Sequence, residues 1–200
     1  MTDADKRDRI ITAAYEVLAK QGYDRASTKE IAATAGVAQG LINYYFQSKD
    51  LLFAEVFRRE AERYCNSIDK LLDFDRKGPL DVEAISGLLE VPKQRAIEDP
   101  EWSKLRYELF AIGLRNDAAM PILREMLQLQ GNHFRKTMET LTGFPPEVAG
   151  PISSVLHATI EGLALQRIAD PSFHYDEAYA MLAKMLGAFY LSLVSEKRES

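Results

Sequence analysis

The stretch of the sequence best suited to binding chemistry is residues 39–50, QGLINYYFQSKD. The amide of Gln39 can both donate and accept hydrogen bonds, and so can the hydroxyls of Tyr44 and Tyr45. Lys49 adds a cation at the end of the same stretch. A buried helix would not carry so many polar groups, and a solvated helix would not need the aromatic rings. The composition therefore indicates a surface that recognises a polar partner.

Groups that would support catalysis or metal binding are sparse. Cys65 is the only cysteine, and no histidine lies near it in the sequence. The three histidines, His133, His157 and His174, lack the spacing of a metal site, and there is no glycine-rich phosphate loop. We therefore expect no catalytic residue, no metal and no cofactor. A small helical enzyme stays an alternative, through a Cys–His or carboxylate pair that only the fold would bring together.

The elements that must position these residues are helices. Apolar residues recur at intervals of three and four throughout, which predicts an all-α fold of about nine helices. The first helix is expected to carry Ile10 to Leu18 and to stop at Gly22, and the second is expected to run from the capping box at Ser27 to Gly36. The third is expected to span about 39–46. The fourth is expected to run from the cap Ser48 to about Leu72, with Leu51, Leu52, Val56 and Phe57 facing inward. After a linker at 73–79, the others are expected at 81–97, from Asp99-Pro100, from Asn116-Asp117 to about Leu141, from Pro145-Pro146 to Ala169, and at about 175–197.

The segment at 31–42, IAATAGVAQGLI, has the pattern of a helix-turn-helix motif. Gly36 supplies the positive φ that the turn requires, and the small Ala32 lets the two helices cross closely. Val37 and Ile42 are apolar and are expected to join a small core. The second helix of such a motif enters the major groove of DNA.

A DNA partner accounts for the polar and aromatic stretch that follows this turn. Gln39 is expected to pair with an adenine edge, and the hydroxyls of Tyr44 and Tyr45 to bond phosphate oxygens. Lys49 lies in the first turn of the next helix, where free backbone N–H groups also favour a phosphate. Phe46 is expected to face the core, while the adjacent tyrosines cannot both face inward.

Charge and hydropathy are compatible with this interpretation. The net charge of the chain is −5, divided into +1 over residues 1–59 and −6 over residues 60–200. A net of +1 permits DNA binding without demonstrating it. The most apolar run, 178–194, contains Lys184 and is shorter than the roughly twenty residues of a membrane span. The charged start and the single cysteine are typical of a cytoplasmic protein, and we expect no membrane insertion.

The stretch from Arg9 to Leu52 resembles the N-terminal domain of TetR-family transcriptional regulators. The matching motifs are, in order, I-x-x-A-A at 10–14, Gly22-Tyr23, T-K-E-I-A-x-x-A-G-V at 28–37, Gly40, Y-Y-F at 44–46 and S-K-D-L-L at 48–52. The resemblance implies a helix-turn-helix DNA-binding domain at residues 1–53, with the motif at about 28–47. It also implies a ligand-binding and dimerisation domain at residues 54–200.

Carried over position by position, the resemblance implies phosphate contacts at the start of the second helix, base contacts at the start of the third, and further phosphate contacts after it. Asn43 stands where tyrosine is most common, and Leu41 where threonine or serine is most common, which leaves the operator sequence open. The implied DNA-binding residues are Thr28, Lys29, Gln39, Gly40, Leu41, Asn43, Tyr44, Tyr45 and Lys49.

The function that the resemblance implies is a ligand-responsive repressor that binds a palindromic operator as a homodimer and is released by a small-molecule effector. The dimer is expected through helices at about 147–169 and 175–197. Two pairs of small residues four apart, Ala158 with Gly162 and Ala183 with Gly187, would let helices approach closely. A monomer with an internal last helix is the alternative to this dimer, and a helical adaptor without a DNA role is the alternative function.

The effector pocket is the least visible feature of the sequence. Aromatic residues and methionines at helical spacing in the middle helices are candidates, although such residues more often fill an ordinary core. His157 and Glu161 lie four residues apart and are expected either to face inward together or to form a surface pair. The candidates are Trp102, Tyr107, Phe110, Met126, Phe134, Met138, His157 and Glu161.

Overall fold

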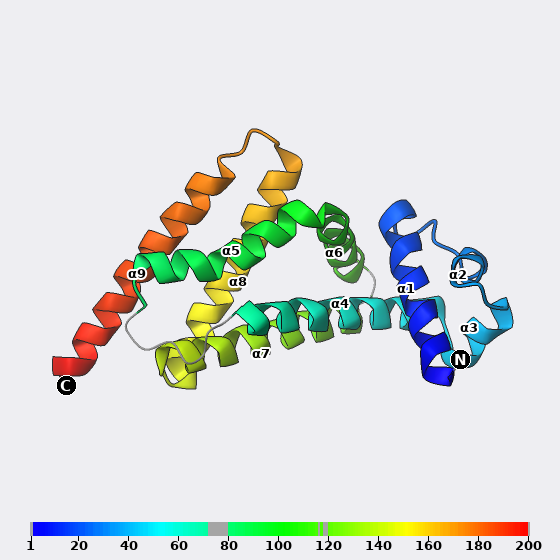
Figure 1. The fold of residues 1–200 in the computed structure, drawn as a ribbon, viewed down its shortest axis with the longest axis horizontal. Coiled ribbons are helices and arrows are strands. Elements are labelled where there is room, and N and C mark those ends of the chain that lie inside the picture. Colours follow the sequence, from blue (N-terminus) through cyan, green and yellow to red (C-terminus); the bar gives the residue numbers. More distant parts are fainter. Residues whose placement is uncertain (1, 72–79, 116, 118–119, 200) are drawn as a thin grey trace. The chain divides into compact units, whose positions relative to one another are not determined.

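The computed structural model describes residues 2–71, 80–115, 117 and 120–199 of the chain. These residues form nine α-helices and no strand, so the predicted all-α class is confirmed (Figure 1). The predicted linker at 73–79 lies outside the described residues, as does residue 116, where the seventh helix was expected to start. The helices are α1 Asp3–Gln21, α2 Thr28–Ala35, α3 Gln39–Tyr45, α4 Lys49–Leu71, α5 Val82–Glu98, α6 Pro100–Gly113, α7 Met120–Thr142, α8 Pro146–Ala169 and α9 Tyr175–Glu199.

The ends of the first helices follow the local signals of the sequence. The side chain of Ser27 accepts a hydrogen bond from the backbone N–H of Glu30 at 3.2 Å and so caps α2. Ser48 caps α4 in the same way, accepting from the N–H of Leu51 at 3.1 Å. Gly22 and Gly36 end α1 and α2 with φ values of +78° and +61°. Residues with a Cβ rarely adopt these values, so the two glycines fix where the helices stop.

The described chain packs as two compact units. The first unit comprises Met1–Cys65 with Glu101–Gln130, and the second comprises Asn66–Pro100 with Gly131–Ser200. Both α4 and α7 therefore contribute residues to each of the two units. The expected division after residue 53 concerns function rather than packing, and it stays a prediction.

The core of the first unit joins the helix-turn-helix to α4 and α6. Ile10, Ile42 and Phe53 are almost completely buried in it, together with Trp102 of α6. The expected inner face of α4 needs one correction, because Leu51 is 51% exposed while Phe53 is fully buried. The buried positions 52, 53, 56 and 57 follow the three-and-four spacing of one helix face, and Leu51 lies outside it.

The core of the second unit is built around the crossing of α5 and α9 (Figure 1). Ala183 is completely buried there, and a Cβ built on Gly187 would lie 2.9 Å from Cγ2 of Val82 in α5. Gly187 thus lets α5 approach α9 within one chain, which corrects its expected role in contacting a second chain. Ala183 is buried within its own chain. In contrast, a Cβ on Gly162 of α8 would meet nothing within 4 Å.

The faces of α8 and α9 that point away from the core of the second unit carry exposed apolar side chains. Met181, Met185 and Phe189 form a stripe at four-residue spacing along α9, and they are 56%, 63% and 47% exposed. By length and hydropathy, residues Pro146–Ala169 and Tyr175–Ser195 are each able to cross a membrane. This is weak support for membrane insertion, because apolar helices of soluble proteins meet the same criterion. An apolar stripe of this kind also fits a protein–protein interface.

Candidate nucleic-acid interface

The turn between α2 and α3 is fixed by both the backbone and a side chain of α1. The N–H of Gly36 bonds the carbonyl of Ala33 at 3.1 Å, and the N–H of Val37 bonds the carbonyl of Ala32 at 3.0 Å. Arg9 of α1 donates from Nη2 to the carbonyl of Ala35 at 2.5 Å. The φ of Gly36 is +61°, which residues with a Cβ rarely adopt, and a Cβ there would lie 3.0 Å from that Nη2, so the Arg9 side chain would have to shift to admit one.

One face of α3 packs inward and the other is open. Ile42 is 1% exposed and Phe46, which follows the helix, is 6% exposed, so the predicted inward position of Phe46 is confirmed. Leu41 is partly buried against the same core. The predicted base-reading and phosphate-binding positions on the open face are exposed, namely Gln39, Gly40, Asn43 and Tyr44. The arrangement leaves amide and hydroxyl groups on a rigid helix facing outward.

The structure brings the start of α2 next to the start of α3. Nε2 of Gln39 lies 3.3 Å from Oγ1 of Thr28, and both side chains are at the surface. Lys29, beside Thr28, is also exposed. Three of the expected contact residues from two helices therefore share one surface. The Gln39 amide keeps its oxygen available for an outside donor in this geometry.

The two adjacent tyrosines have different environments. Tyr44 is 75% exposed, and its ring meets the ring of Tyr45 edge-on with centroids 5.1 Å apart. The hydroxyl of Tyr45 donates to the backbone carbonyl of Asp3 at the start of α1, at 3.2 Å. Burial and the neighbouring Asp3 carboxylate raise the pKa of Tyr45. Tyr45 thus connects α3 to α1, whereas Tyr44 presents its hydroxyl outward.

Lys49 is held against the loop that follows α1. Its Nζ donates to the carbonyl of Tyr23 at 2.8 Å and lies 5.1 Å and 5.2 Å from the ring centroids of Tyr23 and Phe53. The N–H of Tyr23 in turn donates to Oε1 of Glu108 in α6 at 2.9 Å, and its hydroxyl bonds the carboxylate of Asp50. Burial, followed by the bond to Asp50, raises the pKa of Tyr23. Sequence reasoning missed Tyr23 and Glu108 as positioning residues, because 85 positions separate them.

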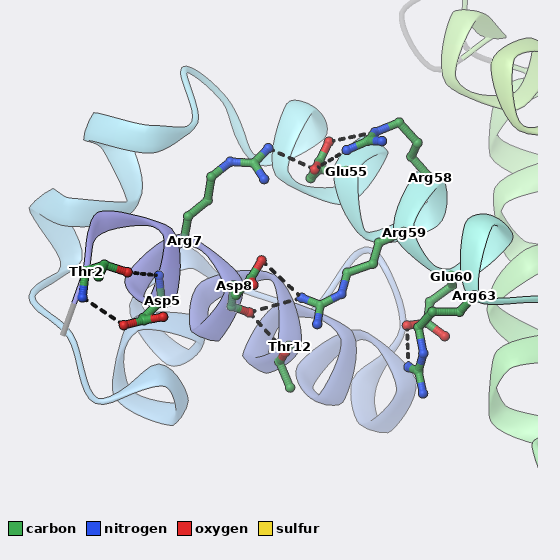
Figure 2. Close-up of polar contacts among 10 residues, drawn as sticks. All are labelled: Thr2, Asp5, Arg7, Asp8, Thr12, Glu55, Arg58, Arg59, Glu60 and Arg63. Atoms are coloured by element: carbon green, nitrogen blue, oxygen red, sulfur yellow. Dashed lines mark hydrogen bonds and ion pairs between the residues drawn. The ribbon is translucent and has the colours of Figure 1, made fainter. Parts of the chain in front are cut away.

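Ion pairs fasten the first half of α4 to α1 (Figure 2). Glu55 accepts from Arg7 of α1 at 2.8 Å and from Arg58 at 2.5 Å. Arg59 donates to the backbone carbonyl of Asp8 at 3.2 Å. Burial alone raises the pKa of Glu55, but the hydrogen bonds from the two arginines outweigh it and hold that pKa below its ordinary value. These contacts therefore join α1 to the first half of α4.

The effector-pocket candidates are divided between the two units. Phe134 and Met138 of α7 line a cavity inside the second unit, with an empty volume of about 870 Å³ that includes the space at its mouth. Trp102 and Met126 instead fill the core of the first unit. Tyr107 and Phe110 of α6 also belong to the first unit and pack edge-on against each other, with centroids 5.9 Å apart.

His157 and Glu161 lie close together on the inward side of α8, which was one of the two expectations for this pair; the other was a surface pair. Nε2 of His157 lies 3.5 Å from Oε1 of Glu161, and both side chains are largely buried. The imidazole also stacks on the ring of Phe134, with centroids 5.0 Å apart. Neither residue lines the cavity. Within the described parts of the chain, no group of three or more His, Cys, Asp or Glu residues is placed to hold a metal ion.

Sequence reasoning missed most of the cavity wall. Leucines, isoleucines, a proline and two aromatic residues of α4, α5, α8 and α9 form it, and no signal separates these residues from ordinary core residues.

The helix-turn-helix geometry agrees with comparisons to known proteins. Residues 10–56 match the family described as bacterial regulatory proteins, tetR family. These residues of the chain are therefore similar to the N-terminal domain of that family. The matched residues begin in α1 and end in α4, so they contain the whole of the helix-turn-helix motif and the first turns of α4.

Individual regulatory proteins match different lengths of the chain. The fatty acid metabolism regulator protein of Bacillus subtilis is 34% identical over 62 residues, which cover 31% of this chain and 32% of that protein. The HTH-type transcriptional regulator YdgC of the same organism is 27% identical over 182 residues, covering 84% and 86%. The first of these matches thus spans only about a third of that relative.

The fold extends over almost the whole chain in solved structures. The transcriptional regulator FadR from Bacillus subtilis, solved in complex with stearoyl-CoA, superposes with a TM-score of 0.65. It is 19% identical, and the superposition covers 92% of this chain and 97% of that chain. At this identity the likeness establishes a shared fold and nothing about the ligand of this protein.

Proposed function

We propose that this TetR-family protein is a ligand-responsive transcriptional repressor that binds a near-palindromic operator as a homodimer in the cytoplasm. The observation that carries the proposal is the open face of α3, where Gln39, Asn43 and Tyr44 are exposed on a helix anchored by buried Ile42 and Phe46. Helix-turn-helix proteins read base edges with side chains at the start of this second helix. A helical enzyme or adaptor would not require this arrangement of amides and hydroxyls.

The residues divide between base reading and backbone binding. Gln39 is proposed to read a base in the major groove, with Thr28 beside it at a phosphate. Tyr44 is proposed to donate to a phosphate oxygen. Lys49 already donates one hydrogen to the Tyr23 carbonyl, and its ammonium has two more hydrogens for a phosphate. The remaining proposed contacts are Lys29, Gly40, Leu41 and Asn43, as the family resemblance implies. Tyr45, whose hydroxyl donates to the Asp3 carbonyl, is proposed to position α3 rather than to contact DNA.

The dimer is proposed to form through the exposed apolar faces of α8 and α9. The stripe of Met181, Met185 and Phe189 on α9 and the exposed Val155 on α8 support this, since an apolar surface of this kind gains stability when it is covered. The same faces account for the membrane-like hydropathy of the two helices without a lipid partner. Two copies of the DNA-binding domain would then match two half-sites of a palindrome.

The effector is proposed to bind the cavity of the second unit. FadR of Bacillus subtilis, which shares the fold, was solved with stearoyl-CoA, and this supports a ligand-binding role for the domain. Release from DNA would follow if the ligand bound more tightly to an arrangement of the dimer that does not fit the operator. α4 is the proposed connection, because it contributes to both units and is fastened to α1 by Glu55.

The test is selection of bound sequences from random duplex DNA, followed by titration of the selected duplex by fluorescence anisotropy. We expect a near-palindromic sequence and an affinity that falls as salt rises, because phosphate contacts displace counterions. Gln39→Ala should relax the preference at one or two positions per half-site, and Lys49→Ala should weaken all sequences about equally. Selection that enriches no sequence, together with affinity independent of salt, would contradict the proposal.

A further inference from the structure

The wall of the cavity in the second unit is almost entirely aliphatic and aromatic. Side chains from α4, α5, α7, α8 and α9 contribute to it, including Leu89, Leu156 and Phe189, whose half-exposed ring also belongs to the stripe on α9. Among the described lining residues there is no Lys, Arg, Asp or Glu. An ion buried against such a wall would lose its hydration without gaining a partner, which is strongly unfavourable in proteins. The wall therefore favours molecules without a charge.

The one titratable imidazole of the wall does not change this conclusion. Burial, which Lys136 reinforces and Asp69 opposes, lowers the pKa of His133 below its ordinary value of 6.5. The imidazole is thus neutral at pH 7. Its Nε2 also lies 3.4 Å from Oδ1 of Asp69, so a carboxylate close to this nitrogen would be repelled by an existing one.

Two hydroxyl groups of the wall have unused hydrogen-bonding capacity. Neither Thr137 nor Tyr190 forms a hydrogen bond with any described residue, although both line the cavity. Neighbouring threonines of α7 behave differently, since Thr140 donates to the carbonyl of Lys136 at 2.9 Å and Thr142 to that of Met138 at 2.7 Å. That back-bonding is the usual choice of a helical threonine. Thr137 instead leaves its hydroxyl for a partner in the cavity.

From these observations we infer that the cavity binds an uncharged, largely apolar molecule that carries one neutral polar group, which Thr137 or Tyr190 hydrogen-bonds. A fatty alcohol, a ketone or an ester has this chemistry. A free fatty acid, an alkylamine or the anionic head of an acyl-CoA does not. The inference names the effector class for the proposed function and rests on that function only where it concerns DNA release.

The test compares ligands that differ only in the head group. Calorimetric titration of the purified full-length protein at pH 7.5 would use 1-decanol, decanoate, decylamine and decanoyl-CoA, each below its micelle concentration. We expect 1-decanol to bind at least tenfold more tightly than each charged ligand. Equal or tighter binding of decanoate or decanoyl-CoA would overturn the inference, and so would a failure of 1-decanol to bind at all.

Three variants locate the ligand and its polar contact. Thr137→Val and Tyr190→Phe each remove one hydroxyl with little change of shape, and at least one should weaken 1-decanol binding by roughly three- to tenfold. Thr140→Val is the matched control on the exposed side of α7 and should leave binding unchanged. Wild-type affinity in both hydroxyl variants would refute the assignment of the polar contact.

The two proposals can fail separately. Calorimetry on the protein without DNA tests the ligand class, and anisotropy with the selected duplex tests the regulatory role. Binding of 1-decanol without any change in operator affinity would remove the effector role and leave the ligand class standing. If the protein binds the operator and decanoate but does not bind 1-decanol, the ligand class is wrong and the regulatory role stands.

Discussion

The adjacent tyrosines of α3 give a matched pair of substitutions with different expected consequences. Tyr44→Phe removes an outward hydroxyl that forms no hydrogen bond with any described residue. Tyr45→Phe removes the hydroxyl that donates to the Asp3 carbonyl at 3.2 Å. Both changes delete one oxygen atom and keep the ring, so the edge-on contact between the two rings is preserved in each variant.

The expected magnitudes follow from what each hydroxyl contacts. A solvated hydrogen bond to a phosphate contributes about 1 kcal/mol, and a dimer carries two copies, so Tyr44→Phe should lower operator affinity by about 2 kcal/mol, or roughly 30-fold. The slope of affinity against salt should not change, because a neutral hydroxyl displaces no counterion. Tyr45→Phe should instead reduce the free energy of unfolding by about 0.5–1 kcal/mol, which lowers the melting temperature by roughly 1–4 °C.

Two measurements on each variant separate these roles. Fluorescence anisotropy with the selected duplex over a range of salt concentrations reports the DNA contact, and thermal unfolding followed by circular dichroism reports the stability. The assignment would be refuted by the reverse pattern, in which Tyr44→Phe melts earlier at full operator affinity and Tyr45→Phe loses affinity at full stability. A double variant should show both effects added, since the hydroxyls share no partner.

Three further predictions concern the residues that hold the DNA-binding helices and the dimer. Glu108→Gln should weaken operator binding several-fold without changing base preference, because the loop at Tyr23 loses a charged acceptor; unchanged affinity would show that α6 does not position this loop. The folded-state pKa of Glu55 lies below the ordinary 4.5, so its stabilising contribution is complete above about pH 4.5 and is lost as the pH falls through the lower value. The difference in urea stability between the wild type and Glu55→Gln should therefore shrink from pH 6 to pH 3, and a constant difference would contradict it. Met185→Glu should give monomers by light scattering, because it places a charge in the exposed apolar stripe. Lys184→Glu is the control, because this neighbouring residue is exposed and already charged, and the variant should stay dimeric.

The sequence by itself determined the helices, the turn and the resemblance of residues 10–56 to the TetR family. These features depend on local chemistry, since Ser27 caps α2 with an N–H three residues away and Gly36 is required by a single positive φ. The inward position of Phe46 also followed from the spacing of apolar residues on one helix. A short motif of this kind carries its structural meaning within about fifty residues, and a comparison of sequences can detect it.

Only the tertiary structure decided which partner each polar or small residue has. Lys49 meets the carbonyl of Tyr23, 26 positions away, and Tyr45 meets that of Asp3, 42 positions away. Gly187 was expected at a dimer contact, yet it admits Val82 of its own chain. Sequence spacing reports which residues share a helix face, but it does not report which helix covers that face.

The cavity shows the same limit most clearly. Of the eight pocket candidates, Phe134 and Met138 line it, while Trp102 and Met126, of the same chemical types, are buried in the first unit. A leucine or aromatic ring that touches other side chains and one that faces an empty volume have the same hydropathy and the same helical period. The difference lies in whether the helices opposite leave space, and that is a property of the packed structure alone.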